Sequence, residues 1–322
     1  MLTRRDFIGV SALTATAACL PVGAQRPVII DTDIGDDIDD TWALLMLLRT
    51  PGLDIKLAVG DYGNAVYRAR LLAKLLELTG RADIPIGIGV GRADEPGNQG
   101  GWLGDYRLDD YAGIVHDDGV QAIVDTVLGS PDEVTLLCLG PVPNIAAALE
   151  REPRIAENAH IVGMYGSVYR GYAGEEGVAA EWNVRVDPAS LQTVFAAPWE
   201  ITITPLDTCG LVTLDGERYR RLYESDDPWL LALMENYAAW LPNAPYMDPA
   251  TDPTRASSTL FDTVAVYLAS QRDLVDIERL PLRVTDDGYT VIDTDNGRPV
   301  DCAVRWRDLD AFKDRLVETL LG

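Results

Sequence analysis

Short apolar runs alternate with longer segments of helical periodicity through the first two thirds of the chain. The apolar runs, whose residues are suited to strands buried on both faces, are 27–31, 54–59, 84–88, 134–139, 160–164 and 200–204. Apolar side chains recur with helical spacing between them, at 40–49, 64–79, 119–129 and 143–150. This alternation predicts an α/β fold with a mainly parallel, Rossmann-like sheet flanked by helices.

The C-terminal part has a different pattern. Residues 281–308 predict two or three short antiparallel strands with a turn at Asp287-Gly288, and 308–320 predict a closing helix. The sequence contains no internal repeat, no stretch typical of a membrane span and no linker long enough to divide it. We therefore expect one domain over residues 25–322.

The first 24 residues resemble an export signal. Arg4 and Arg5 precede an apolar stretch, and Val22-Gly23-Ala24 offers a small-residue cleavage site, which together are typical of a twin-arginine signal peptide. Lipid attachment at Cys19 is disfavoured, because Thr16 stands where a leucine-like residue is needed. We expect a periplasmic or secreted product.

Charge and cysteine usage narrow the possible chemistry. The 322 residues include 51 acidic and 27 basic side chains, a net charge of −24, which argues against nucleic-acid polymers and anionic membranes as partners. Outside the leader, Cys138, Cys209 and Cys302 are widely spaced in apolar contexts and predict buried thiols. His116 and His160 are the only histidines, so a histidine-rich zinc site is excluded.

Six aspartates occupy residues 31–40, directly after the first predicted strand. Carboxylates this close raise one another's pKa, and a divalent cation would offset the repulsion. In a parallel α/β sheet, ligands bind beyond the carboxyl ends of the strands, where this cluster lies. Three long stretches rich in Gly, Pro and Asp, 91–118, 165–181 and 242–258, predict functional loops.

The D-x-D-x-G start of the cluster has three common meanings. An EF-hand is disfavoured, because the twelfth position from Asp31 is Trp42 and not glutamate. A haloacid-dehalogenase-type phosphatase is disfavoured by Ile34, where that chemistry uses Thr or Val, and by the lack of a suitably placed lysine. The third meaning is a calcium site at a Rossmann-like sheet edge that binds a sugar diol.

The rest of the chain favours the third meaning. Six blocks resemble the inosine–uridine preferring nucleoside hydrolase family: "VIIDTDIGDDIDDTWAL", "LLCLGPVPNIAAALEREPRI", "IVGMYGSV", "AEWNVRVDP", "ITPLDT" and "LFDTVAV". They occur in the family's order and span residues 28–266. Any one block is a weak signal, whereas six in order are specific.

The resemblance implies that Ca²⁺ binds the ribose hydroxyls and the attacking water. By position, Asp33 corresponds to the general base that also touches the metal, Asp40 to a bidentate ligand, Asp262 to the last metal carboxylate, and Leu139 to a main-chain carbonyl ligand. The aspartate loop is two residues longer than the family's, so Asp36 and Asp37 compete for these assignments, with Asp37 the reserve ligand. Structural alternatives are a helix N-terminal role for Asp36 and an N-cap role for Asp262 before a helix over 262–269.

The resemblance also implies a substrate-binding set. Its expected sugar contacts are Asp39, Asn64, Glu181 and Asn183, with Trp182 either stacking on the sugar or packing. Its possible base contacts are Phe261, Tyr237, Trp240 and Tyr246. For Asn64 and the "AEWN" stretch the alternative is a role in loop structure, and for the helical aromatics it is core packing.

One departure from the family concerns the leaving group. The family places a histidine before the last metal aspartate, and this chain has Phe261 there. The family's asparagine before "AEWN" is also missing, with Glu175 and Glu176 nearby. The expected function is calcium-dependent hydrolysis of the N-glycosidic bond of ribonucleosides, in a protein that could form a homo-oligomer. The alternatives are a nucleoside- or ribose-binding or differently specialised member without the usual acid, and, less favoured, a phosphatase.

Overall fold

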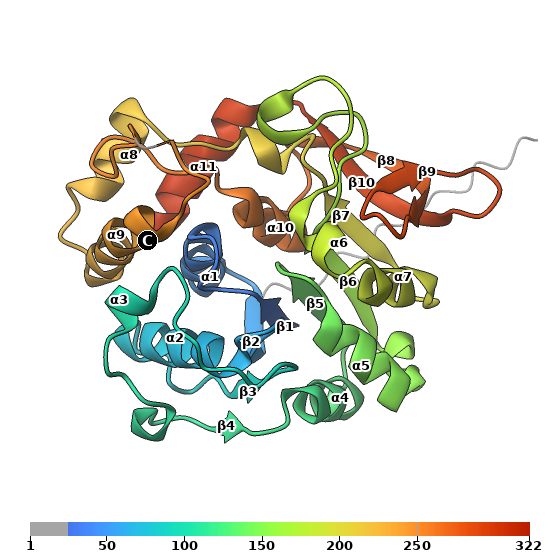
Figure 1. Ribbon diagram of the computed structural model, residues 1–322, viewed down its shortest axis with the longest axis horizontal. Coiled ribbons are helices and arrows are strands. Elements are labelled where there is room, and N and C mark those ends of the chain that lie inside the picture. Colours follow the sequence, from blue (N-terminus) through green and yellow to red (C-terminus); the bar gives the residue numbers. More distant parts are fainter. Residues whose placement is uncertain (1–24, 249) are drawn as a thin grey trace, which may run out of the picture.

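A single mixed sheet organises the chain. The computed structural model describes residues 25–248 and 250–322, and within them ten strands pair in the order β4-β3-β2-β1-β5-β6-β7-β10-β8-β9 (Figure 1). The strands are β1 (Arg26–Thr32), β2 (Leu53–Gly60), β3 (Ile86–Ile88), β4 (Val115–His116), β5 (Val134–Cys138), β6 (Ala159–Met164), β7 (Ile201–Thr204), β8 (Val275–Val284), β9 (Thr290–Ile292) and β10 (Arg298–Trp306). The expected leader, with Arg4, Arg5 and Cys19, lies outside the described residues.

Helices cover both faces of the sheet (Figure 1). They are α1 (Asp39–Arg49), α2 (Ala65–Leu78), α3 (Gly100–Leu103), α4 (Gly119–Gly129), α5 (Pro143–Arg151), α6 (Trp182–Val186), α7 (Pro188–Ala196), α8 (Gly216–Tyr223), α9 (Pro228–Trp240), α10 (Phe261–Ser270) and α11 (Leu309–Leu321). One apolar core joins α1, α2 and α8–α11 to the sheet, and a second core joins α4, α5 and α7 to the opposite face. The predicted fold class is confirmed.

The central strand β1 shows why the apolar runs form the middle of the sheet. Val28, Ile29 and Ile30 are completely buried. Successive side chains of a strand point to opposite faces, and Ile29 accordingly packs in one core while Val28 and Ile30 pack in the other. Strands that are apolar on both faces can only sit between two helical layers.

The topology reverses at β1. The chain moves outward from β1 through β2 to β3 and β4, then returns to place β5 on the other side of β1. Such a switch point leaves a crevice beyond the carboxyl ends of the two neighbouring strands, where α/β proteins bind ligands. The aspartate cluster therefore leaves β1 at the place where the fold provides a binding crevice.

The expected antiparallel strands are present, and they extend the main sheet. β8 pairs antiparallel with both β9 and β10. Gly288, with a φ of +85°, lies in the turn between β8 and β9. β10 also pairs parallel with β7, so these strands continue the sheet instead of forming a separate layer. Helices α3, α6, α7 and α8 and the short strand β4 were not predicted.

Cys138, Cys209 and Cys302 are free and buried, as predicted. Among the described helices, none has both the length and the apolar character that crossing a bilayer requires.

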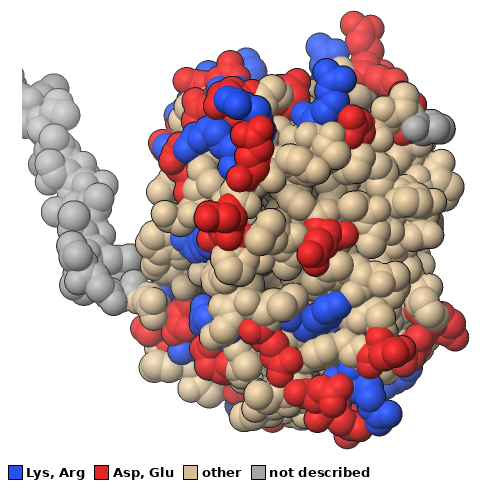
Figure 2. Space-filling model, turned by 90° about the vertical axis from the view of Figure 1, so that its left-hand side faces the viewer, with Lys and Arg blue, Asp and Glu red and all other residues tan. Residues whose placement is uncertain are grey.

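On the face shown in Figure 2, basic side chains mostly lie beside acidic ones. Arg218, for example, bridges α8 to α11 through Asp310 and Asp314, at 2.7 and 2.6 Å. Exposed pairs of this kind contribute little stability individually. Their consequence is that most basic side chains of the described residues have a carboxylate partner.

Candidate active site

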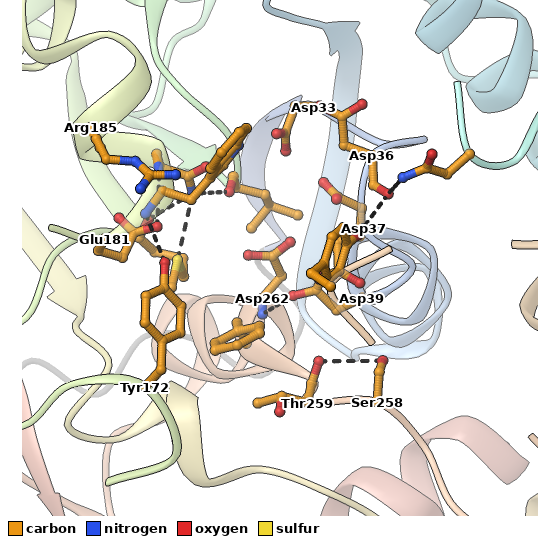
Figure 3. A pocket seen from close by; sticks show the side chains of 18 of the residues that line it. Asp33, Asp36, Asp37, Asp39, Tyr172, Glu181, Arg185, Ser258, Thr259 and Asp262 are labelled. Carbon is orange, nitrogen blue, oxygen red and sulfur yellow. Dashed lines mark hydrogen bonds between the residues drawn. The ribbon is translucent and has the colours of Figure 1, made fainter. Parts of the chain in front are cut away.

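A cavity of about 730 Å³ opens beyond the carboxyl ends of β1, β5 and β6 (Figure 3). Its walls are Asp33, Asp36, Asp37, Asp39, Asp40, Asn98, Leu139, Met164, Tyr172, Ala180, Glu181, Trp182, Asn183, Arg185, Pro245, Tyr246, Met247, Ser258, Thr259, Phe261 and Asp262. Each of the three long loops contributes to the wall, through Asn98, Tyr172 and Tyr246. The loops predicted to be functional therefore surround the switch-point crevice.

Three carboxylates meet at the floor of the cavity. Asp39 and Asp40 begin α1 and Asp262 lies in the first turn of α10, and these two helices pack together. One oxygen from each of the three carboxylates lies within 4.8 Å of the others. The backbone N–H of Asp262 donates to Asp39 Oδ2 at 3.2 Å. Asp262 does not cap its helix, because the N-cap position belongs to Leu260.

Electrostatics make this cluster unfavourable without a cation. Burial, reinforced by the neighbouring carboxylates, raises the pKa of both Asp39 and Asp262 well above the usual range. Burial also raises the pKa of Asp40 to about 6, although the Thr32 hydroxyl donates to its carboxylate and lowers it. Three converging, buried carboxylates are hard oxygen ligands, so the donor set fits Ca²⁺.

Asp33 is held beside the cluster by its backbone. The Arg68 side chain is almost fully buried and donates to the carbonyl oxygens of Asp33 and Ile34. Burial and the charge of Asp40 raise the pKa of the Asp33 carboxyl well above its ordinary value, and Arg68 lowers it. A carboxylate that holds a proton more readily than usual is suited to accepting one near neutral pH.

Asp36 and Asp37 lie on the side of Asp33, across the cavity from Glu181 (Figure 3). Asp36 forms an ion pair with Arg68 at 3.0 Å, and it precedes the first residue of α1 by three positions. Asp37 Oδ1 accepts a hydrogen bond from the Ile38 N–H at 2.6 Å, and burial raises the pKa of Asp37 to about 7. Both side chains line the cavity, but neither belongs to the three-carboxylate cluster.

Glu181 and Asn183 form the wall nearest β5 and β6. The Glu181 carboxylate caps α6 and accepts from the backbone N–H groups of Gly166 at 3.0 Å and Asn183 at 2.7 Å. Burial raises the pKa of Glu181 to about 7 despite these donors. Asn183 Nδ2 donates to the Leu139 carbonyl at 2.7 Å, which leaves that oxygen one further lone pair.

Three residues predicted to contact substrate lie away from the cavity wall. Asn64 is at the N-terminal boundary of α2, and Tyr237 and Trp240 are fully buried. The Tyr237 hydroxyl donates to the Ala256 carbonyl at 3.2 Å, and Trp240 Nε1 donates to the Asp36 carbonyl at 2.8 Å. The helical aromatics of α9 thus support the loops around the site, while Tyr246, Trp182 and Phe261 line it.

The sequence-based set omitted several residues that the structure brings to the site. Tyr172 and Arg185 line the cavity. Asp31 and Asp61 lie behind it, both fully buried, and Asn144 Nδ2 donates to Asp31 Oδ1 at 2.7 Å. Asp61 could have been found, because it directly follows the second predicted strand; Tyr172 and Arg185 carry no such signal. Glu175 and Glu176 do not line the cavity.

Known proteins of one family resemble this chain in sequence. A family model described as "Inosine-uridine preferring nucleoside hydrolase" matches residues 28–314. The inosine-uridine preferring nucleoside hydrolase of Crithidia fasciculata is 26% identical over 303 residues, covering 86% of this chain and 90% of that protein. A pyrimidine-specific ribonucleoside hydrolase of Salmonella arizonae is 28% identical over 259 residues, covering 74% and 82%.

Solved structures show the same architecture. A plant nucleoside hydrolase superposes with a TM-score of 0.75 at 26% identity, covering 92% of this chain and 98% of that one. A purine-preferring ribonucleoside hydrolase from Gardnerella vaginalis superposes with a TM-score of 0.73 at 22% identity, over 92% and 98% of the two chains. The second likeness supports the fold alone.

Proposed function

Because the chain belongs to the inosine-uridine preferring nucleoside hydrolase family, and is therefore an enzyme of that type, we propose that it hydrolyses ribonucleosides with Ca²⁺ and with Asp33 as general base. The observation that carries the proposal is the buried cluster of Asp39, Asp40 and Asp262 beside Asp33. The relatives' names mention inosine, uridine and pyrimidine ribonucleosides, which supports ribonucleosides as the substrate class.

The three clustered carboxylates would hold the ion, with the Leu139 carbonyl and Asp33 as further candidate ligands. Asp39 was predicted as a sugar contact, and its place in the cluster supports a metal-ligand role instead. When bound, Ca²⁺ would supply positive charge that orients the ribose hydroxyls and favours ionisation of the attacking water.

The side chains then have separate tasks. Asp33 accepts the proton of the water that attacks the anomeric carbon, while the bond to the base breaks through a transition state with oxocarbenium character. Glu181, held by backbone N–H donors, offers its carboxylate to the sugar hydroxyls. Asn183, whose Nδ2 donates to the Leu139 and Met164 carbonyls, offers its Oδ1 as a second acceptor. Their rigid positions hold the ribose with its anomeric carbon toward Asp33.

Chromatography of a nucleoside panel, with added calcium or with EDTA, tests the proposal. We expect free base and ribose from at least one ribonucleoside with calcium and almost none with EDTA. Stoichiometric binding without product formation would favour the nucleoside-binding alternative. Hydrolysis of p-nitrophenyl phosphate with no action on any nucleoside would favour the phosphatase.

We also propose that residues 1–24 direct export as a twin-arginine signal. The support is the Arg4-Arg5 pair followed by an apolar stretch and small residues. Cell fractionation of the wild type and of the Arg4→Lys, Arg5→Lys double variant is the test. Retention of the variant in the cytoplasm with the wild type outside it is expected, and identical distributions would contradict export by this route.

A further inference from the structure

One cationic side chain enters the otherwise acidic cavity. Arg185 is contributed by α6 and lines the wall. Figure 3 shows Arg185 on the side of Glu181, across the cavity from Asp36 and Asp37.

Two contacts restrain the exposed side chain of Arg185. Its guanidinium carbon lies 5.0 Å from the centre of the Trp182 ring, within the range of a cation–π contact. Its backbone and stem lie against the turn between β8 and β9, where a methyl group added at Gly288 would come within 2.5 Å of the Arg185 Cα. The guanidinium is therefore held at the cavity wall by an aromatic ring and a glycine turn.

Arg185 has no carboxylate of its own among the described residues. Most arginines of the described chain pair with an acidic side chain within 4.0 Å, whereas Arg185 forms no such pair and no side-chain hydrogen bond there. Glu181 is close enough for the charge of Arg185 to lower its pKa, but its carboxylate is held by backbone N–H groups and forms no ion pair with Arg185. The donors of the guanidinium are thus available to a ligand in the cavity.

A neutral nucleoside offers such a group only uncharged acceptors, the base carbonyls and ribose hydroxyls, which bind a guanidinium less strongly than an anionic oxygen does. A divalent cation at the floor would offset the carboxylates of Asp39, Asp40 and Asp262, which are the ones that meet there, and Arg185 lies apart from them at the wall. A guanidinium presents several N–H donors in a planar fork that matches the oxygens of a carboxylate or phosphate. The arrangement is therefore better suited to a substrate that carries an anionic group remote from the bond that breaks.

We propose that Arg185 makes the enzyme selective for ribonucleosides that bear an anionic oxygen group, a phosphate or a carboxylate. This inference rests on the proposed hydrolase function and refines its substrate class. The anionic group would either be a phosphate on the ribose or a carboxylate on the base, and both would use the same guanidinium fork.

Three substrates that share uracil and ribose separate these sources. We would measure kcat/KM for uridine, for uridine 5′-monophosphate and for orotidine, which carries a carboxylate on the ring, with calcium present. We expect one anionic substrate to exceed uridine by at least about tenfold, since a hydrogen bond to a charged group contributes about 1.5–3 kcal/mol. The preference should weaken as sodium chloride is raised, because salt screens an exposed charge.

Arg185→Gln should reduce the ratio of anionic to neutral kcat/KM by about 10- to 100-fold, by the same strength of a charged hydrogen bond. Arg185→Lys keeps the positive charge but lacks the planar guanidinium, and it should retain part of the preference for the anionic substrate. Arg170→Gln removes an exposed arginine outside the cavity wall and should leave the ratio unchanged.

If the wild type cleaves no ribonucleoside at all, the hydrolase proposal and this inference both fail. If it cleaves uridine at least as well as both anions, this inference alone is wrong, and that comparison needs no variant. A preference that survives unchanged in folded Arg185→Gln would also overturn the role of Arg185.

Discussion

Gly140 lies against Asp33 so closely that a methyl group added to it would come within 2.7 Å of the Asp33 Cβ, Cγ and Oδ1 atoms. The two residues follow neighbouring parallel strands, β5 and β1, on either side of the switch point. The Tyr165 hydroxyl donates to the Gly140 carbonyl at 3.0 Å, which restrains the Gly140 backbone from moving away. A glycine is therefore needed here for Asp33, the proposed general base, to occupy its position.

Gly140→Ala is expected to lower kcat by about 10²-fold, since a displacement of about 1 Å at a reacting group can cost that much. The measurement is kcat with saturating calcium, together with a circular-dichroism melt to show that the variant is folded. Gly129→Ala, at a glycine with no neighbouring heavy atom within 4 Å of the added methyl group, is the matched control and should keep wild-type kcat. Wild-type activity in Gly140→Ala would mean that Asp33 is not the base or is free to shift.

Asp33→Asn removes the proton acceptor while conserving size. Loss of general-base catalysis typically lowers the rate by about 10²–10⁴-fold, and we expect kcat to fall by that factor. Asp36→Asn is a suitable comparison, because Asp36 lines the same cavity but pairs with Arg68. A decrease of less than about tenfold in Asp33→Asn, below the range for general-base catalysis, would assign the base elsewhere.

Calcium should stabilise the folded protein through the carboxylate cluster. A ligand that binds only the native state adds about 2.7 kcal/mol to the free energy of unfolding at a hundredfold excess over its Kd. The melting temperature should therefore be several degrees higher with calcium than with EDTA. Asp262→Asn should reduce that difference, and equal melts of the wild type in both conditions would exclude calcium binding.

The sequence was sufficient to predict the sheet and most of the carboxylates at the floor of the cavity. Runs such as 27–31 are apolar on both faces, a pattern that only a strand covered on both sides satisfies. Asp40 and Asp262 are far apart in the chain, and it was the resemblance that placed both at one metal. The structure brings their carboxylates together by packing α1 on α10.

The parts that escaped prediction depend on which way a side chain faces. Tyr237 and Trp240 lie in a helix that is apolar over much of its surface, so periodicity could not tell core from cavity. Arg185 has the appearance of an ordinary solvated charge within "AEWNVRVDP". Its place at the cavity depends on the Gly288 turn, about a hundred residues later in the chain.

Glu181 should make the metal-free protein less stable as pH rises. Burial raises its pKa from 4.5 to about 7, so between these values the native state binds a proton that the unfolded chain releases. The stabilisation is complete below about pH 4.5, the ordinary value, and is lost as the pH passes through the raised pKa.

Glu181→Gln should consequently flatten the decline in the free energy of unfolding between about pH 5 and 8, measured by urea titration in EDTA. Its absolute stability should also fall, because the carboxylate that caps α6 is weakened, so the slope is the informative quantity. Glu176→Gln, at an exposed residue outside the cavity wall, should keep the wild-type slope. An unchanged slope in Glu181→Gln would contradict the raised pKa.

The departing base requires a proton when the glycosidic bond breaks. Phe261 cannot donate one, but Tyr172 lies against it, with ring centres 6.1 Å apart in an edge-to-face arrangement. The Tyr172 hydroxyl accepts a hydrogen bond from the Trp182 backbone N–H at 2.9 Å, so its own proton is available to the cavity. Burial raises the pKa of Tyr172, which suits it to donating a hydrogen bond to the leaving base more than to releasing the proton fully.

Two substrates with different leaving groups can separate these roles. A nitrophenyl riboside needs no acid, whereas inosine does, and general-acid assistance typically contributes about 10²–10⁴-fold. If no residue replaces the missing histidine, kcat/KM for the nitrophenyl riboside should exceed that for inosine by a comparable factor, and Phe261→His should narrow the gap. If Tyr172 assists, Tyr172→Phe should slow inosine alone. Equal rates on both substrates in the wild type and in Tyr172→Phe would show that another group supplies the proton.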